Sequence, residues 1–268
     1  MPRLCPSAVW RDRFARNATA PRPIPWGSPV RWTPDERRAV AASVREFQLG
    51  EQSEGRHLQR CADRYAARTG DAPYAEAMRL FIGEEARHAA ELARLLASAG
   101  ERLAARSALD SVFRVVRKLG PGDGLEVCLR VLVAAEGVAV HYYAALRDAT
   151  GCPVTRALCA QILRDEAAHV RFHAERLARL QSDRGAVGRR AVRAAHRVLM
   201  ASTAGAVWLG PHRRVLRRGG LSGPAFFRAC FQTLDVRVLR VEAAADRPPT
   251  ATSRLPETRP RRASTAAR

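Results

Sequence analysis

Two segments of this sequence place a glutamate and a histidine three residues apart. The first reads EEARH from residue 84, and the second reads DEAAH from residue 165. Residues i and i+3 lie on the same face of a helix, and in both segments that face is otherwise mostly apolar. Carboxylates and imidazoles on a buried helix face are typical ligands of divalent metal ions. The two predicted ligand pairs are Glu85 with His88 and Glu166 with His169.

Other acidic residues also lie on apolar stripes, where a charge is costly to bury. Glu136 lies near the middle of one apolar run, and Glu51 and Glu54 lie on the stripe of an earlier one. Several carboxylates buried together destabilise a fold strongly unless positive charge neutralises them. Since these stripes contain no arginine, a pair of divalent ions is the simplest source of that charge.

The intervals between these acids fit helices that fold back on one another. Glu54 precedes Glu85 by 31 residues, and Glu136 precedes Glu166 by 30. A long helix, a short link and a return to the same height account for both intervals. Each helical hairpin would therefore place its single glutamate level with the Glu-x-x-His pair of the partner helix.

Helical periodicity extends through most of the chain and predicts an all-α fold. Thr33, Pro34 and Glu36 form a capping-box sequence, so we expect a helix to begin there. The expected long helices are 33–68, 71–98, 124–149 and 153–182, with a short helix at 108–118 and further helices at 187–209 and from 222. The four long helices suit a four-helix bundle, with the short helix in its crossover connection.

The two ends of the chain differ in composition from this helical region. Prolines among arginines predict a disordered N-terminal arm at residues 1–32 and a disordered basic tail at residues 243–268. We therefore expect the bundle to occupy residues 33–183. Appended helices would occupy residues 184–242 and pack on the bundle.

Over residues 33–182 the chain resembles the ferritin-like di-iron carboxylate superfamily, whose pattern is Glu, Glu-x-x-His, Glu, Glu-x-x-His. The resemblance implies a ferritin-like four-helix bundle that holds two iron ions, or one manganese and one iron. The interval to Glu85 favours Glu54 as the first ligand, whereas the wider spacing in many relatives favours Glu51. The implied metal-binding residues are Glu51, Glu54, Glu85, His88, Glu136, Glu166 and His169.

The resemblance also implies roles for residues around these ligands. Relatives with EExRH and DExxH segments use the additional acid to orient a histidine ligand, which implies this role for Glu84 and Asp165. His173 and Tyr143 lie one and two turns beyond predicted ligands on the same helix faces. Each is either a neighbour of the metal ions or an ordinary core residue.

A di-iron centre of this family reduces O2, and its members differ in what they oxidise. A rubrerythrin-like protein usually carries a four-cysteine module, for which this chain has no CxxC pair. The two flanking arms and added helices do not suit the compact storage ferritins, although a ferroxidase stays an alternative. We expect an O2-dependent oxidoreductase of a small organic or lipid-like substrate. An electron-donor protein and a second copy of the chain are further expected partners.

The charge of the chain is strongly positive and unevenly distributed. The formal net charge is +20, and residues 186–240 contain eleven arginines and a single acid, Asp235. Such a region could contact an anionic membrane or an acidic partner, so a non-enzymatic helical protein is the second alternative. Lys118 is the only lysine. This arginine bias weakens the case for a nucleic-acid partner, which we do not expect.

The six cysteines are scattered along the chain and predict reduced thiols in a cytoplasmic protein. Cys61 and Cys128 are expected to be buried. His57, which forms a third Glu-x-x-His with Glu54, is expected at the surface or behind the metal ligands. The N-terminus has no apolar run typical of a signal peptide, and the longest uncharged stretch is too short for a membrane span.

Overall fold

The computed structural model describes residues 4–52, 55–104 and 124–245, and the regular structure in these ranges is entirely helical. The all-α prediction is therefore confirmed for this part of the chain. The elements are α1 (Ser7–Thr19), α2 (Pro34–Glu51), α3 (Gly55–Thr69), α4 (Ala72–Ser98), α6 (Leu125–Asp148), α7 (Pro153–Leu180), α8 (Ala186–Leu209), α9 (His212–Arg218), α10 (Gly223–Thr233), the π-helical segment η1 (Leu234–Leu239) and α11 (Arg240–Ala245).

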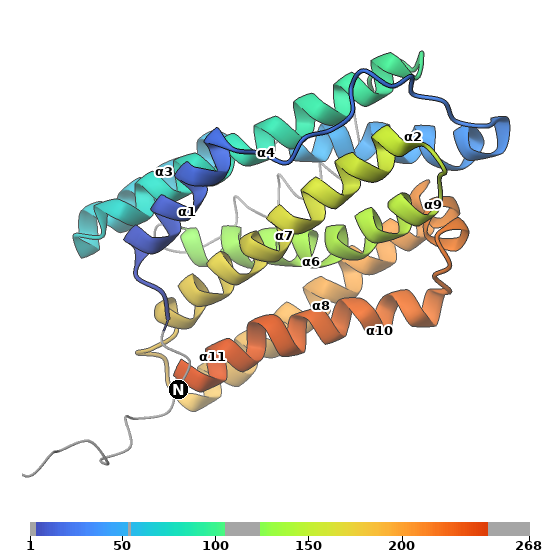
Figure 1. Ribbon diagram of the computed structural model, residues 1–268. Helices are drawn as coiled ribbons and strands as arrows, with labels where there is room; N and C mark the ends of the chain where they lie inside the picture. Colours follow the sequence, from blue (N-terminus) through green and yellow to red (C-terminus); the bar gives the residue numbers. More distant parts are fainter. Residues whose placement is uncertain (1–3, 53–54, 105–123, 246–268) are drawn as a thin grey trace, which may run out of the picture.

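The centre of the fold is built from α4, α6 and α7 together with the shorter helices α2 and α3 (Figure 1). Helix α4 packs against α2, α3 and α7, and α6 packs most extensively against α7. By length and composition α6 could cross a membrane, since its most apolar 18-residue stretch has a mean hydropathy of 1.3. However, 72% of that stretch is buried inside the fold. Helix α6 is therefore a largely buried helix, which packs against α3, α7, α8, α9 and α10.

The capping box predicted from the sequence is present at the start of α2. The Glu36 amide donates to Thr33 Oγ1 at 3.2 Å, and the Thr33 amide donates to Glu36 Oε2 at 2.8 Å. The second oxygen of the same carboxylate, Glu36 Oε1, accepts the amide of Gly151 at 2.7 Å. One side chain thus satisfies the first turn of α2 and ties it to the link between α6 and α7.

The single helix expected over residues 33–68 is instead two helices, α2 and α3, and residues 53–54 between them lie outside the described residues. Glycines flank this junction, and glycine is a poor helix former. Gly55 also begins α3 close to α4, because a Cβ at this position would lie 3.2 Å from Ile82 Cγ2. The close approach of α3 to α4 is thus a second reason for glycine at the junction.

The prediction that residues 1–32 form a disordered arm is wrong for the residues described. Helix α1 packs on α4, and its Trp10 and Phe14 are 3% and 1% exposed. Trp10 Nε1 donates to Glu175 Oε2 on α7 at 2.9 Å, and Trp32 Nε1 donates to Thr155 Oγ1 at 3.0 Å. Aromatic burial of this kind outweighs the proline-rich composition.

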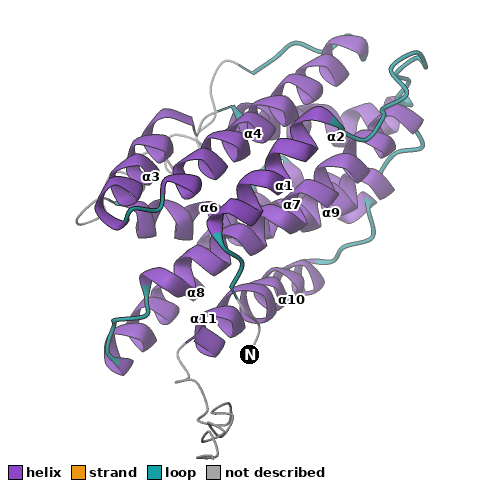
Figure 2. Cartoon of the chain, turned by 60° about the vertical axis from the view of Figure 1, so that its left-hand side comes forward, coloured by secondary structure: helices purple, strands orange, loops and turns teal. Residues whose placement is uncertain are grey.

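The C-terminal helices form an added layer against α6 and α7 (Figure 2). Helices α8 and α10 contact α6, whereas η1 and α11 contact α7. Helix α9 was not anticipated, and it packs against α2 and α6. After it, Gly219 lies so close to α6 that a Cβ would be 2.3 Å from the Ala145 carbonyl oxygen. The short helix expected at 108–118 and most of the expected tail lie outside the described residues.

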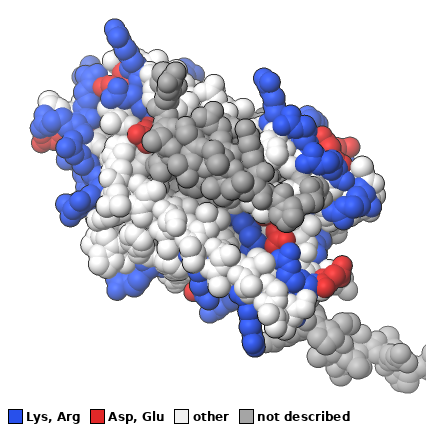
Figure 3. Space-filling view, turned by 180° about the vertical axis from the view of Figure 1, so that it is seen from behind, with Lys and Arg blue, Asp and Glu red and all other residues white. Residues whose placement is uncertain are grey.

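Arginine is the dominant charged residue at the surface, as the composition predicts. In the view from behind, arginine side chains project around the rim of the molecule and acidic side chains occupy smaller areas between them (Figure 3). Some surface arginines form ion pairs with acidic side chains. One example is Arg197, whose Nη2 lies 2.6 Å from Asp235 Oδ1. The charge of the described residues is therefore spread over the helical surface.

Candidate metal centre

Carboxylates and imidazoles from α2, α4, α6 and α7 meet inside the fold, in two groups that share one residue. The donor atoms of each group lie within 4.8 Å of one another. The first group is Glu51, Glu85, His88 and Glu166, and the second is Glu136, Glu166 and His169. Glu166 belongs to both groups, so its carboxylate links them.

The two histidines turn the same ring nitrogen towards the carboxylates. His88 Nδ1 lies 3.6 Å from Glu85 Oε1, and 3.9 Å from both Glu51 Oε2 and Glu166 Oε1. His169 Nδ1 lies 3.2 Å from Glu85 Oε1 and 3.9 Å from Glu166 Oε2. Glu85, like Glu166, therefore lies between the two imidazoles.

Many polar atoms at the centre of these groups are buried and have no hydrogen-bond partner. A buried polar atom without a partner is strongly unfavourable, and natural folds contain few of them. Those that belong to the two groups lie close together, where added cations would give them partners, while His173 lies beside Glu136 and belongs to neither group. The atoms are Glu85 Oε1, His88 Nδ1, both oxygens of Glu136, Glu166 Oε2, His169 Nδ1 and both ring nitrogens of His173.

The electrostatics of the centre also favour an added positive charge. Burial raises the pKa of Glu85 and Glu166 well above the usual value for glutamate, and the neighbouring carboxylates raise both further. Burial likewise raises the pKa of Glu136 to about 8. These carboxylates repel one another in an environment with little water, and divalent cations among them would reverse that effect.

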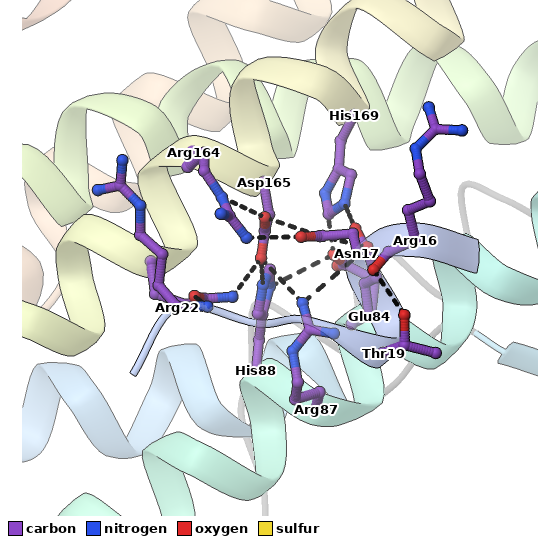
Figure 4. Close-up of polar contacts among 12 residues, drawn as sticks. Arg16, Asn17, Thr19, Arg22, Glu84, Arg87, His88, Arg164, Asp165 and His169 are labelled. Atoms are coloured by element: carbon purple, nitrogen blue, oxygen red, sulfur yellow. Dashed lines mark hydrogen bonds and ion pairs between the residues drawn. The ribbon is translucent and has the colours of Figure 1, made fainter. Parts of the chain in front are cut away.

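The outer nitrogens of the two histidines are held by acids from the opposite helix (Figure 4). His88 Nε2 on α4 lies 3.2 Å from Asp165 Oδ2 on α7. His169 Nε2 on α7 lies 2.8 Å from Glu84 Oε2 on α4. Each acid thus contacts the histidine of the other Glu-x-x-His segment.

Asn17 of α1 joins these two acids and was missed by the sequence analysis. Its Nδ2 donates to Glu84 Oε1, and to Asp165 Oδ1 at 2.9 Å. Asp165 Oδ2 also accepts from Arg87 Nη2 and from Gln161 Nε2, each at 2.9 Å. Asn17 follows Phe14 by three residues, so the apolar face of α1 is the signal that could have placed it.

Tyr143 and His173, which the sequence left between a metal-neighbour and a core role, both touch predicted ligands. The Tyr143 hydroxyl donates to Glu51 Oε1 at 2.6 Å, and burial raises its pKa well above the usual value for tyrosine. His173 Nε2 lies 3.2 Å from Glu136 Oε1. Burial, together with His169, holds the pKa of His173 well below its usual range, which keeps the ring neutral.

Of the two glutamates proposed for the first ligand position, only Glu51 can be placed. Its side chain is 7% exposed and contributes to the first group. Glu54 lies outside the described residues. The end of α2 therefore brings Glu51 level with the middle of α4.

A surface cavity of about 320 Å³ opens on the outer side of the Asn17 network. Arg13, Arg16 and Arg164 line it together with Glu84 and Asp165. Arg164 Nη2 donates to Asn17 Oδ1, so this asparagine lies between the cavity and the two histidines. The cavity is therefore separated from the carboxylate centre by the acids that hold the histidines.

Comparison with known proteins identified no matching family model, no matching curated protein and no matching solved structure.

Proposed function

We propose that this chain is a ferritin-like di-metal carboxylate protein that uses two iron ions, or manganese and iron, to oxidise a small organic or lipid-like molecule with O2. The observation that carries the proposal is the pair of ligand groups that share Glu166. Glutamates from α2 and α6 face the two Glu-x-x-His pairs of α4 and α7, which is the ligand arrangement of di-iron bundles.

The donor types fit iron or manganese better than softer metals. Carboxylate oxygens predominate and the remaining donors are imidazole nitrogens, a combination that suits Fe and Mn. Glu51, Glu85, His88 and Glu166 would hold one ion, and Glu136, Glu166 and His169 would hold the other. When bound in the reduced state, the metal pair supplies the electrons that O2 takes up.

Residues of this chain would prepare the centre for that chemistry. Asp165 and Glu84 hold the two imidazoles so that Nδ1 faces inward, and Asn17 fixes both acids. Tyr143 donates a hydrogen bond to Glu51 and restricts the rotation of its carboxylate. The apolar side chains of α4, α6 and α7 exclude bulk water from the centre.

Metal analysis of the purified full-length chain tests the proposal directly. We expect about two iron or manganese ions per chain, and an absorbance change when the anaerobic ferrous protein meets O2. Glu166→Ala should abolish loading of both ions because both groups use this residue, whereas Glu136→Ala should affect one. His141→Gln is the matched control on α6, because His141 Nε2 is hydrogen-bonded to Thr233 Oγ1 instead.

The product of the reaction distinguishes an oxidoreductase from an iron-storing ferroxidase. Repeated additions of Fe²⁺ should give one round of oxidation and no accumulated ferric mineral if the oxidant is used on an organic substrate. Continued ferrous turnover with mineral formation would favour the ferroxidase. Full metal occupancy in folded Glu166→Ala protein would contradict the metal centre itself.

Peripheral contact with an anionic membrane is a second proposed role, favoured by the outer face of α8. Val187, Val198 and Leu209 are 81%, 66% and 82% exposed and recur every eleven residues, so they share one face. Several arginines of α8 and α9 are also exposed. Sedimentation with anionic vesicles should be sensitive to salt and to Val198→Glu, and absence of binding at low salt would exclude this role.

A further inference from the structure

A third group of metal-binding side chains lies outside the candidate metal centre and has no part in the proposed oxidation. It consists of His57 and Cys61 on α3 and Cys128 on α6, and their donor atoms all lie within 4.8 Å of one another. Cys61 and Cys128 are 0% and 1% exposed, which confirms their expected burial, and His57 is half-buried.

The distances in this group suit a tetrahedral ion. His57 and Cys61 are four residues apart on the same face of α3, and His57 Nε2 lies 3.7 Å from Cys61 Sγ. Bond lengths of about 2.3 Å to sulfur and about 2.0 Å to nitrogen put tetrahedral donors about 3.5 Å apart. The pair therefore needs little movement to bind one ion, and Cys128 reaches it from the neighbouring helix α6.

A cation lies beside one of the two sulfurs, and the thiolate is the form of cysteine that binds metals. Arg64 Nη2 lies 3.4 Å from Cys61 Sγ and places a positive charge beside it. Gly124, just before α6, also lies against this sulfur, since a Cβ there would be 3.8 Å from it. With two thiolates and one imidazole, the group is much softer than the carboxylate centre and selects a different metal.

We propose that His57, Cys61 and Cys128 form a mononuclear site for a borderline or soft cation, with Zn²⁺ as its natural occupant. The three donors leave one tetrahedral position for a water molecule or another donor. Bound zinc would clamp α3 to α6, two helices that already pack against each other. The proposal does not depend on the oxygen chemistry of the carboxylate centre.

Cobalt substitution tests this site separately from the carboxylate centre. Co²⁺ bound to thiolates absorbs in the near ultraviolet by charge transfer from sulfur, and Co²⁺ bound to carboxylates and imidazoles does not. We expect this absorption to saturate at about one Co²⁺ per reduced chain and to disappear when Zn²⁺ is added. It should persist in Glu166→Ala, so a failure of the carboxylate centre would not affect the result.

Cysteine variants identify the ligands. Cys61→Ser and Cys128→Ser should abolish the absorption and His57→Ala should weaken it, while Cys159→Ser, a buried thiol on α7, should retain it. Should the ligand variants not fold, X-ray absorption of zinc-loaded Glu166→Ala protein should show sulfur neighbours at about 2.3 Å. The site would be overturned if the reduced, cobalt-loaded chain showed no sulfur-to-cobalt absorption, or if bound zinc had no sulfur neighbours. If Cys61 and Cys128 are found as a disulfide, the absorption must appear once that disulfide is reduced, and its absence would also overturn the site.

Discussion

His169 on α7 and Glu84 on α4 come from different Glu-x-x-His segments, yet the imidazole Nε2 lies 2.8 Å from the carboxylate Oε2. His88 and Asp165 repeat the relationship in the opposite direction at 3.2 Å. Each segment therefore supplies an acid that holds the histidine of the other. Since Nε2 is engaged in both rings, Nδ1 is the nitrogen that faces the buried carboxylates.

This exchange of partners predicts a loss of metal affinity when either acid is neutralised. Asp165→Asn and Glu84→Gln keep the size of the side chain but remove the charge that makes the imidazole a better ligand. Loss of such an orienting carboxylate typically costs about 10- to 100-fold in metal affinity. We expect a loss of this size for Fe²⁺ or Mn²⁺ in each variant, measured by competition with a chromophoric chelator.

Glu175→Gln is the matched control for these variants. Glu175 is also a buried carboxylate on α7, but it accepts hydrogen bonds from Trp10 Nε1 and the Cys5 amide on the N-terminal segment. Its replacement should leave metal affinity unchanged. Wild-type affinity in Asp165→Asn would show that the acid does not act through His88.

Asn17→Ala should loosen both acids at once. The asparagine amide donates to Glu84 and Asp165, and its removal leaves two buried carboxylates each short of one donor. We expect the free energy of unfolding to fall by about 1–3 kcal/mol and metal affinity to fall with it. Urea titration and chelator competition measure the two effects, with Thr19→Ala, an exposed site at the end of α1, as the control. Unchanged stability would mean that α1 only covers the centre.

The elements that the sequence predicts well are those with strong local signals. Thr33 and Glu36 mark a helix start through their side chains, and the structure has that capping box. Glycine and proline similarly delimit α4, α6 and α7 to within a few residues of the expected bounds. Helical periodicity also predicts that Glu85 and Glu166 lie on inward helix faces, and both side chains are buried in the first residue group.

Other features depend on tertiary contacts that no local pattern contains. The proline-rich composition of residues 1–32 does not predict that Trp10 and Phe14 are buried, and this burial makes α1 part of the core. Asn17 gains its role only because α1 crosses the two acids. Similarly, Cys128 is 67 residues from Cys61, and only the packing of α3 on α6 brings the two sulfurs together.

Tyr143→Phe should weaken metal binding at the candidate metal centre, whereas Tyr142→Phe should not. The Tyr143 hydroxyl donates to Glu51 Oε1 at 2.6 Å, while the neighbouring Tyr142 hydroxyl accepts from Ser43 Oγ at 2.9 Å. Each variant loses one buried hydrogen bond, for which we expect about 1–3 kcal/mol of destabilisation. Only Tyr143→Phe should also weaken metal binding, measured as the concentration of Fe²⁺ at half-loading. Equal metal binding by the two variants would contradict a role for Tyr143 in holding Glu51.

The environment of His196 predicts a loss of stability in mild acid that is separate from the candidate metal centre. Burial, and the Arg130 guanidinium 2.9 Å from its Nδ1, lower the pKa of His196 from 6.5 to about 3. Between these two pH values the imidazole is protonated in the unfolded chain but not in the folded chain. The free energy of unfolding therefore falls as the pH decreases below 6.5. For this one group the fall is at most about 1.4 kcal/mol per pH unit. His196→Gln keeps an acceptor for Arg130 and does not titrate. Urea titrations across this range should therefore show a shallower decline for the variant, and parallel declines would mean that His196 is protonated equally in both states.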